Sequence, residues 1–242
     1  AESAKKIEQM GIAGVDINMG CPARKVTKNL QGSALIKDPK LAAKIVEAVK
    51  KAVKIPVSVK TRLGYGEYDS KKFLDFCKGL QEAGADILTI HGRTVAQGFS
   101  GEADWEPIYM LKEKLKIPVI GNGDIKSAKT AILKLKNLDG IMVGRAVFGN
   151  PWIIPEIAAK FKGKKYTPPK GIIEKIPLIL KHCELSIKMK GEKHGIMEIR
   201  KHLAAYIKGF AKASKYRGRL VQVKTLDDVK EIFEDIGYCR PV

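Results

Sequence analysis

Short apolar runs alternate with segments of helical spacing through the first 150 residues of this chain. The runs are rich in Val and Ile, end in glycine or polar residues, and lie at 15–19, 57–63, 86–90, 117–120 and 139–143. Helical segments between them begin at capping residues, namely Asp38, either Asp69 or Ser70, and Ser127. Strict alternation of this kind specifies a parallel sheet covered by helices, either doubly wound or closed into a barrel.

The strand ends favour the barrel. The chain has no Gly-x-Gly-x-x-Gly turn, and residues capable of chemistry follow all five runs instead of gathering at one switch point. The last two runs end in the glycine turns Gly121-Asn122-Gly123 and Gly144-Arg145, where barrels place a phosphate site. We predict a (β/α)8 TIM barrel with five of its eight βα units in this chain. Because the sequence begins inside a helix, we expect a fragment that lacks the first three strands.

The pattern changes after Asn150-Pro151-Trp152, where the strand signal stops. Residues 160–170 read as a basic linker containing Thr167-Pro168-Pro169, and helices are predicted at 172–190, 193–213 and 225–236. We therefore predict two domains, a partial barrel over residues 1–160 and a small helical domain over residues 161–242.

The charge is strongly basic and unevenly distributed. The net charge is +19, and residues 160–242 carry 20 Lys and Arg against 9 Asp and Glu. Between Ile199 and Lys224 there are eight basic side chains and no acidic one, with Tyr206, Phe210 and Tyr216 interleaved. Such a stretch is either a solvated helix face or a surface for RNA, and the overall excess favours affinity for a polyanion.

Bulk features exclude several classes of protein. No apolar run reaches the roughly 18 residues that a membrane span needs, and residues 1–6 have no signal-peptide character. The four cysteines are far apart, without a Cys-x-x-Cys pair, so neither a zinc site nor a disulfide framework is indicated. We expect a cytoplasmic monomer with no resident metal and no membrane partner.

The strand ends also supply candidate chemistry. Asn18-Met19-Gly20-Cys21-Pro22 closes the first run with a cysteine on the lip of a turn. Taken singly, Cys21 could be a small buried hydrophobe, Lys60 a surface lysine and His91 a core histidine. Together they bring a thiol, an ammonium, an imidazole and two glycine turns to one edge of one sheet.

Five ordered motifs resemble the tRNA-dihydrouridine synthase family, most closely its bacterial B-type branch. They are the stretch from Asp16 to Pro22, that from Val59 to Gly64, His91-Gly92-Arg93-Thr94 with Gln97-Gly98-Phe99, the stretch from Ile120 to Ile125, and Gly144-Arg145 with that from Gly149 to Trp152. The segment with Arg200-Lys201-His202 and residues 206–209 is similar to the family's C-terminal RNA-binding domain. The resemblance covers essentially the whole chain, without the family's first three strands.

The resemblance implies reduction of uridine to 5,6-dihydrouridine in tRNA, with FMN as cofactor and NADPH as reductant. Cys21 matches the general acid that protonates C5 while hydride reaches C6, a role that suits a thiol because thiols are mostly protonated at neutral pH. The other matches are flavin contacts at Lys60 and His91, ribityl and phosphate contacts at Asn122, Gly123, Asp124, Gly144 and Arg145, a uracil contact at Asn18, and RNA contacts at Lys25 or Arg24 and at Arg200 and Lys201.

Two alternatives remain. An FMN oxidoreductase of the dihydroorotate dehydrogenase type, acting on a small molecule, would share the phosphate turns and the lysine but leaves the basic helical tail unexplained. A non-catalytic RNA-binding barrel would keep that tail, but it has no use for Cys21, Lys60 and His91 together.

Overall fold

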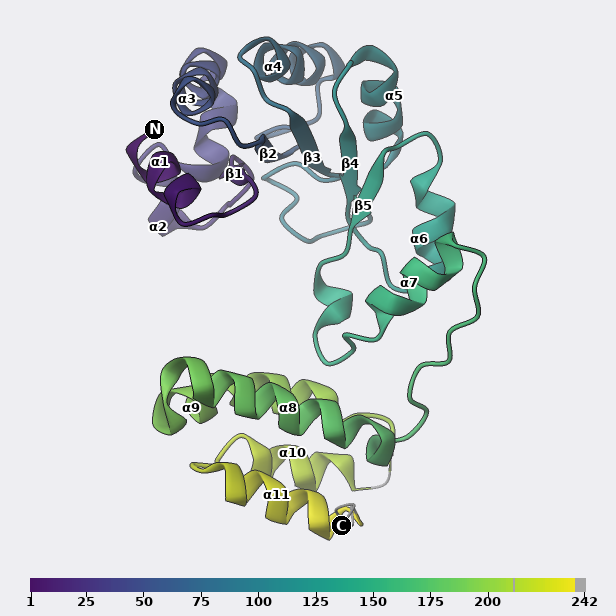
Figure 1. Ribbon diagram of the computed structural model, residues 1–242. Coiled ribbons are helices and arrows are strands. Elements are labelled where there is room, and N and C mark those ends of the chain that lie inside the picture. The colour runs from purple at the N-terminus through teal and green to yellow at the C-terminus, as the bar shows by residue number, and fades with distance from the viewer. Residues whose placement is uncertain (211, 238–242) are drawn as a thin grey trace. The chain divides into compact units, whose positions relative to one another are not determined.

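The computed structural model describes residues 1–210 and 212–237 (Figure 1). The chain forms two compact units, Ala1–Gly144 and Arg145–Val242. The predicted division at 160/161 lies inside the second unit, because the segment before it packs with the C-terminal helices. Trp152 joins their apolar core, and the backbone of Gly149 lies against Ala205.

The first unit is built on a parallel sheet with its strands in sequence order. Its strands are β1 (Val15–Asn18), β2 (Val57–Arg62), β3 (Ile87–His91), β4 (Val119–Asn122) and β5 (Gly140–Met142). A doubly wound sheet reverses its strand order at a switch point, whereas a barrel adds each strand beside the last. The predicted α/β barrel class, with five βα units, is confirmed.

Helices cover one side of this sheet. They include α1 (Glu2–Gln9), α3 (Pro39–Ala52), α4 (Ser70–Glu82), α5 (Glu106–Lys114) and α6 (Ala128–Leu135), and α3, α4 and α5 follow its outer side in Figure 1. The predicted caps form: the carboxylates of Asp38 and Asp69 accept the amides of Leu41 and Lys72, and Ser127 forms a capping box. Each cap contributes about 1 kcal/mol and fixes where its helix begins.

Strand alternation divides the sheet into an apolar face and a polar face. Val57 packs with Val49 of α3 and with Val53, the residue after α3, and Val59 shares its side of β2. Side chains between these apolar positions point to the opposite face, which carries Asp16, Asn18, Ser58, Lys60, Arg62, His91 and Asn122. The polar face is thus the inner face of the partial barrel.

The connection between β1 and α3 contains two short helical elements. These are α2 (Arg24–Thr27) and the 3-10 helix η1 (Gly32–Lys37). Gly32 has φ +58°, and a Cβ there would stand 2.8 Å from the Cys21 carbonyl oxygen. The Ser33 amide donates to that same oxygen at 3.0 Å. Glycine at position 32 therefore lets η1 pack directly on the turn that carries the thiol.

The second unit is helical, as predicted. It contains η2 (Arg145–Val147), α7 (Ile153–Phe161), α8 (Ile172–Lys190), α9 (Glu192–Tyr206), α10 (Ala213–Leu220) and α11 (Leu226–Asp235). Its core joins residues from four of these helices, among them Ile179, Cys183, Ile199, Leu203, Leu220 and Phe233. Gly191, with φ +76°, makes the turn between α8 and α9.

Two details of the second unit differ from the prediction. Helix α7 was not expected, and the single helix predicted over 193–213 is wrong because α9 ends at Tyr206 and α10 begins at Ala213. Gly209 has φ +78°, which a continuous helix cannot accommodate. The break also lets Ile207 bury its side chain completely while its carbonyl oxygen accepts Nη1 of Arg217 at 3.0 Å. Residue 211 lies outside the described residues.

Candidate active site

Strand register brings the predicted site residues of the first unit to one edge of the sheet. Asn18 lies opposite Lys60, Arg62 opposite His91, and His91 opposite Asn122. All four strands run in the same direction, so these positions meet at the carboxyl edge, where barrels place their chemistry. The predicted juxtaposition of Asn18, Lys60, His91 and Asn122 on neighbouring strands is thus present.

Lys60 is a half-buried cation paired with an amide. Its Nζ lies 3.2 Å from Oδ1 of Asn122, whose Nδ2 donates to the Met142 carbonyl oxygen at 2.8 Å. No carboxylate lies within ion-pair distance of Lys60 in the described part of the chain. Burial lowers the pKa of Lys60, and the neighbouring Arg62 lowers it further. An anionic or electron-rich group placed here would find an ammonium that has no direct carboxylate partner, although the charge of Asp16 partly opposes the lowering of its pKa.

His91 is held in its neutral form. The ring is buried, and burial together with the cations Arg62, Lys60 and Arg93 lowers its pKa to about 4. Nη1 of Arg93 lies 3.4 Å from Nε2 of His91. Because a guanidinium nitrogen can only donate, Nε2 must be the unprotonated nitrogen, and we assign the proton to Nδ1. At neutral pH His91 therefore contributes hydrogen bonds without contributing charge.

A buried ion pair supports this histidine. Arg93 is almost completely buried, and its Nη2 lies 2.6 Å from Oδ2 of Asp124. The Asp124 carboxylate also accepts the amide of Ala103 at 2.8 Å. Arg93 donates to the carbonyl oxygens of Ser100 and Gly101, so the pair connects the end of β4 to the loop after β3. Asp124, predicted as a cofactor contact, has a structural partner in this pair.

Arg62 and Phe99 are site residues that the sequence reasoning did not single out. The Arg62 guanidinium donates to the carbonyl oxygens of Gly20, Thr94 and Gly98, each at 3.0 Å, and so connects the loops after β1 and β3. Phe99 is 61% exposed, with its ring centroid 6.2 Å from that of His91. Strand periodicity could have identified Arg62, because it lies two residues after Lys60 and points to the same face. Phe99 had no comparable signal.

The Cys21 thiol differs from the other described cysteines. It is free and half-buried, whereas Cys77 and Cys183 are buried. Burial raises the pKa of both, that of Cys183 to about 12. Oδ1 of Asn18 accepts the amides of Gly20 and Cys21 at 3.0 and 3.1 Å, so Asn18 shapes this turn and keeps only its Nδ2 for a ligand. Cys239 lies outside the described residues.

The two glycine turns have different surroundings. Gly123 has φ +133°, and a Cβ there would stand 2.5 Å from the Cβ of Ala103 and 3.3 Å from the His91 ring. Gly144 is exposed and has open space around it, which leaves its backbone accessible to a ligand. Arg145 begins η2 in the second unit, so its predicted phosphate contact stays a prediction.

The predicted RNA contacts also divide into two kinds. Lys25 and Arg24 are exposed on α2, and Lys201 is exposed on α9. Arg200 is half-buried, and its Nε donates to the Val223 carbonyl oxygen at 2.8 Å. Arg200 therefore has a structural role that the charge pattern did not indicate.

Among residues 1–210 and 212–237, no helix combines the length and apolar character that a membrane crossing requires.

Fold and site together define a protein of the parallel (β/α)-barrel class, with a thiol, an ammonium and a neutral imidazole at the carboxyl edge of its sheet. The model of the family "Dihydrouridine synthase (Dus)" matches residues 1–238, and this chain belongs to that family.

Several named relatives are similar over most of this chain. A probable tRNA-dihydrouridine synthase of Rickettsia prowazekii is 43% identical over 234 residues, which are 96% of this chain and 71% of that protein. A probable tRNA-dihydrouridine synthase 1 of Synechocystis sp. is 42% identical, over 97% of this chain and 66% of that protein. The tRNA-dihydrouridine synthase B of Pseudomonas aeruginosa is 35% identical, over 94% and 69%. The predicted family is confirmed, and the chain spans about two thirds of the length of these relatives.

Proposed function

We propose that this chain reduces uridine to 5,6-dihydrouridine in tRNA, in the cytoplasm, with Cys21 as the proton donor. The observation that carries the proposal is the half-exposed thiol of Cys21 at the carboxyl edge of the sheet, in a chain of the dihydrouridine synthase family. Reduction of the C5–C6 double bond needs a hydride at C6 and a proton at C5. The Sγ–H bond of Cys21 would break as its proton forms the new C5–H bond.

The residues at this edge suit FMN. Lys60 and Arg62 are cations without a carboxylate partner among the described residues, which fits an electron-rich ring, and Gly144 offers open backbone for a phosphate. We propose that Lys60, His91, Asn122, Gly123 and Asp124 hold the flavin, with Gly144 and Arg145 at its phosphate. When bound, FMN would supply the hydride for C6, and NADPH is the proposed source of its electrons.

Substrate recognition would use the side-chain donor of Asn18 that is not hydrogen-bonded within the turn after β1. The Nδ2 amide of Asn18 can donate to a uracil carbonyl, because its Oδ1 is already occupied by two backbone amides. The exposed ring of Phe99 offers a stacking surface near His91. A uridine must leave its stack to reach Cys21, and unpaired loop nucleotides do so at the lowest cost.

We assign RNA binding chiefly to residues 161–242 and catalysis to residues 1–160. The basic stretch from Ile199 to Lys224 supports this division, with Lys201 exposed for phosphate contact and Lys25 as a further contact in the first unit.

The test is the dihydrouridine content of tRNA from a host strain with this gene deleted. We expect loss at one or more positions, restored by the wild-type gene and not by Cys21→Ala. A second readout is flavin absorbance of the purified protein, which should fall in Lys60→Met and persist in Cys21→Ala. Unchanged dihydrouridine in a deletion strain with no redundant synthase would refute the proposal and favour a small-molecule substrate.

A further inference from the structure

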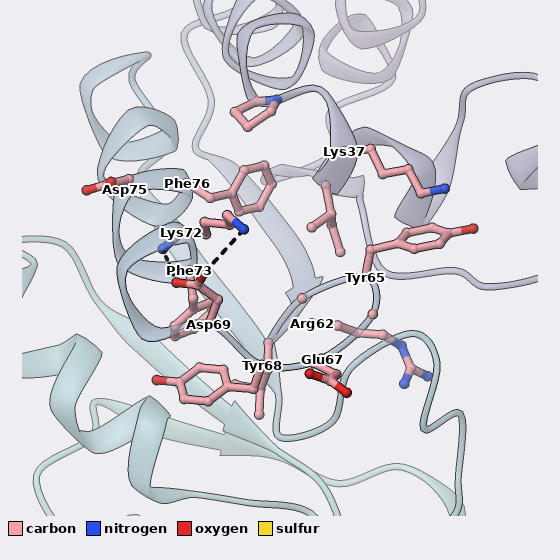
Figure 2. A pocket seen from close by; sticks show the side chains of 15 residues that line it. Lys37, Arg62, Tyr65, Glu67, Tyr68, Asp69, Lys72, Phe73, Asp75 and Phe76 are labelled. Carbon is pink, nitrogen blue, oxygen red and sulfur yellow. Dashed lines mark hydrogen bonds and ion pairs between the residues drawn. The ribbon is translucent and has the colours of Figure 1, made fainter.

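A pocket of about 870 Å³ lies next to the candidate active site (Figure 2). Its wall comes from the end of η1, the start of α3, the loop between β2 and α4, and the first turns of α4. Arg62 lines it while also donating to the Gly20 carbonyl oxygen beside Cys21. The pocket therefore shares one side chain with the proposed reaction site and is otherwise separate from it.

Four aromatic residues line the pocket, namely Tyr65, Tyr68, Phe73 and Phe76, of which Phe73 and Phe76 are buried. Figure 2 shows Tyr65 and Tyr68 pointing to opposite sides of the loop between β2 and α4, so they offer two separate ring faces. The Lys37 ammonium lies 3.8 Å from the centroid of the Tyr65 ring. Tyr68 meets Phe73 edge to face at 6.0 Å. Lys37 thus covers one face of the half-buried Tyr65 ring, and a base would stack on the opposite face, since proteins use aromatic rings with nearby cations to stack single-stranded bases.

Backbone hydrogen bonds hold the Tyr65 loop in place. The carbonyl oxygens of Gly64 and Tyr65 accept the amides of Val95 and Ala96, both at 2.9 Å. These amides belong to the loop that carries Phe99. The two aromatic surfaces, Tyr65 and Phe99, therefore lie on loops that are hydrogen-bonded to each other.

The charges that line the pocket are balanced. Three cations, Lys37, Arg62 and Lys72, face three carboxylates, Glu67, Asp69 and Asp75. Asp69 is already engaged, because it caps α4 and pairs with Lys72 at 3.3 Å. Glu67 and Asp75 are exposed and have no ion-pair partner in the described part of the chain. A balanced pocket with an available carboxylate, Glu67, on the same loop as Tyr65 suits a neutral planar ring with N–H donors better than a polyphosphate.

We propose that this pocket binds an unstacked base of the RNA substrate, one with an exocyclic amino group, close to the target uridine. The base would stack on the face of Tyr65 opposite Lys37 and donate its amino hydrogens to Glu67, which lies on the same loop, as cytosine does to acidic side chains elsewhere. Lys37 would meet the attached phosphate. This inference rests on the proposed function and adds a second base-recognition point, with a preference opposite to the uracil of the reaction site.

Nucleoside titrations of the isotope-labelled full chain test the pocket without any turnover. We expect the amide resonances of residues 63–69 to shift and saturate with cytidine, adenosine or guanosine, and much less with uridine. Tyr65→Ala should abolish the shifts and Tyr65→Phe, the matched control that keeps the ring, should preserve them. Glu67→Gln should remove the preference for amino-bearing bases, whereas Asp75→Asn, on the other side of the pocket from Tyr65, should leave it unchanged.

Filter binding of tRNA gives the second readout. Tyr65→Ala should weaken binding roughly 5- to 150-fold, which corresponds to the loss of one base-stacking ring, while Tyr65→Phe binds like wild type. Circular dichroism establishes that both variants are folded. Absence of shifts with every nucleoside, together with unchanged tRNA affinity in Tyr65→Ala, would overturn the pocket proposal. Normal dihydrouridine formation by that variant would then leave the proposed function intact.

A third outcome identifies a different ligand. If adenosine 2′-phosphate 5′-phosphate saturates the same resonances and the nucleosides do not, the pocket binds a dinucleotide reductant. That result would overturn the RNA assignment.

Discussion

Asp124→Asn should lower the free energy of unfolding of the first unit by about 3 kcal/mol. Arg93 is 2% exposed and its guanidinium lies 2.6 Å from the Asp124 carboxylate, so neutralising Asp124 leaves a buried charge without its counterion. Removing one partner of a buried pair costs about 3–5 kcal/mol. The lower end applies because the Asp124 side chain is 16% exposed and an asparagine carbonyl can still accept from Arg93 and Ala103. Asparagine also tolerates the φ of +50° at this position.

Urea denaturation followed by tryptophan fluorescence measures this effect in the relevant unit. Trp105 donates to the Gly123 carbonyl oxygen one residue from Asp124, and Trp152→Phe in every sample leaves Trp105 as the reporter. Glu47→Gln is the control, since it removes an exposed i,i+4 partner of Lys51 and should cost under about 0.5 kcal/mol. A loss below about 1 kcal/mol in Asp124→Asn would refute the argument that the pair is buried and charged.

Three further predictions follow from the same structure. Because the pKa of His91 is lowered to about 4, the unfolded chain binds a proton below pH 6.5 that the folded chain does not, so stability falls as pH falls from 6.5 towards 4. Between pH 7 and pH 4.5 we expect the unfolding free energy to fall by about 2 kcal/mol less in His91→Gln than in the wild type. An identical pH dependence in the variant and the wild type would contradict this prediction. Gly32→Ala should lower the free energy of unfolding by about 2 kcal/mol, because position 32 has φ +58° and abuts Cys21. In a Cys239→Ser background, the same change should also alter the rate at which the Cys21 thiol reacts with a disulfide reagent. Gly66→Ala is its control, since a Cβ there has open space; equal effects would count against the packing argument. Finally, Lys201→Ala should reduce the salt dependence of tRNA binding by about one phosphate contact. Arg200→Lys should chiefly lower the free energy of unfolding, by about 1 kcal/mol, because it loses the hydrogen bond to the Val223 carbonyl oxygen. The reverse result would mean that Arg200 contacts RNA.

Local signals account for what the sequence predicted well. The caps at Asp38, Asp69 and Ser127 and the short apolar strands depend on neighbours in the chain, so their positions follow from local chemistry. The family was also identifiable from five ordered motifs, and the match over residues 1–238 confirms it. The parallel order of the strands follows because alternating β and α segments leave few other ways to bury the apolar faces.

Errors arose where long-range packing outweighs local preference. The helix predicted over 193–213 breaks after Tyr206 because Ile207 gains full burial and an Arg217 contact from α10. Helix α7 lies in a short segment whose apolar residues, Ile153 and Ile157, are buried. Neither effect can be recognised in a window of neighbouring residues, because the partners come from elsewhere in the chain.

By itself the sequence determined the barrel class, the helical second unit, the family and the candidate residues Cys21, Lys60 and His91. Only the tertiary structure decided which of the predicted site residues carry a charge and which already form hydrogen bonds within the protein. Burial, together with the nearby charges of Arg62, Lys60 and Arg93, lowers the pKa of His91 and keeps it neutral. Asn18 and Arg200 use some of their side-chain hydrogen-bonding groups on the backbone. Burial and through-space charge depend on residues distant in sequence, and for that reason no motif could report them.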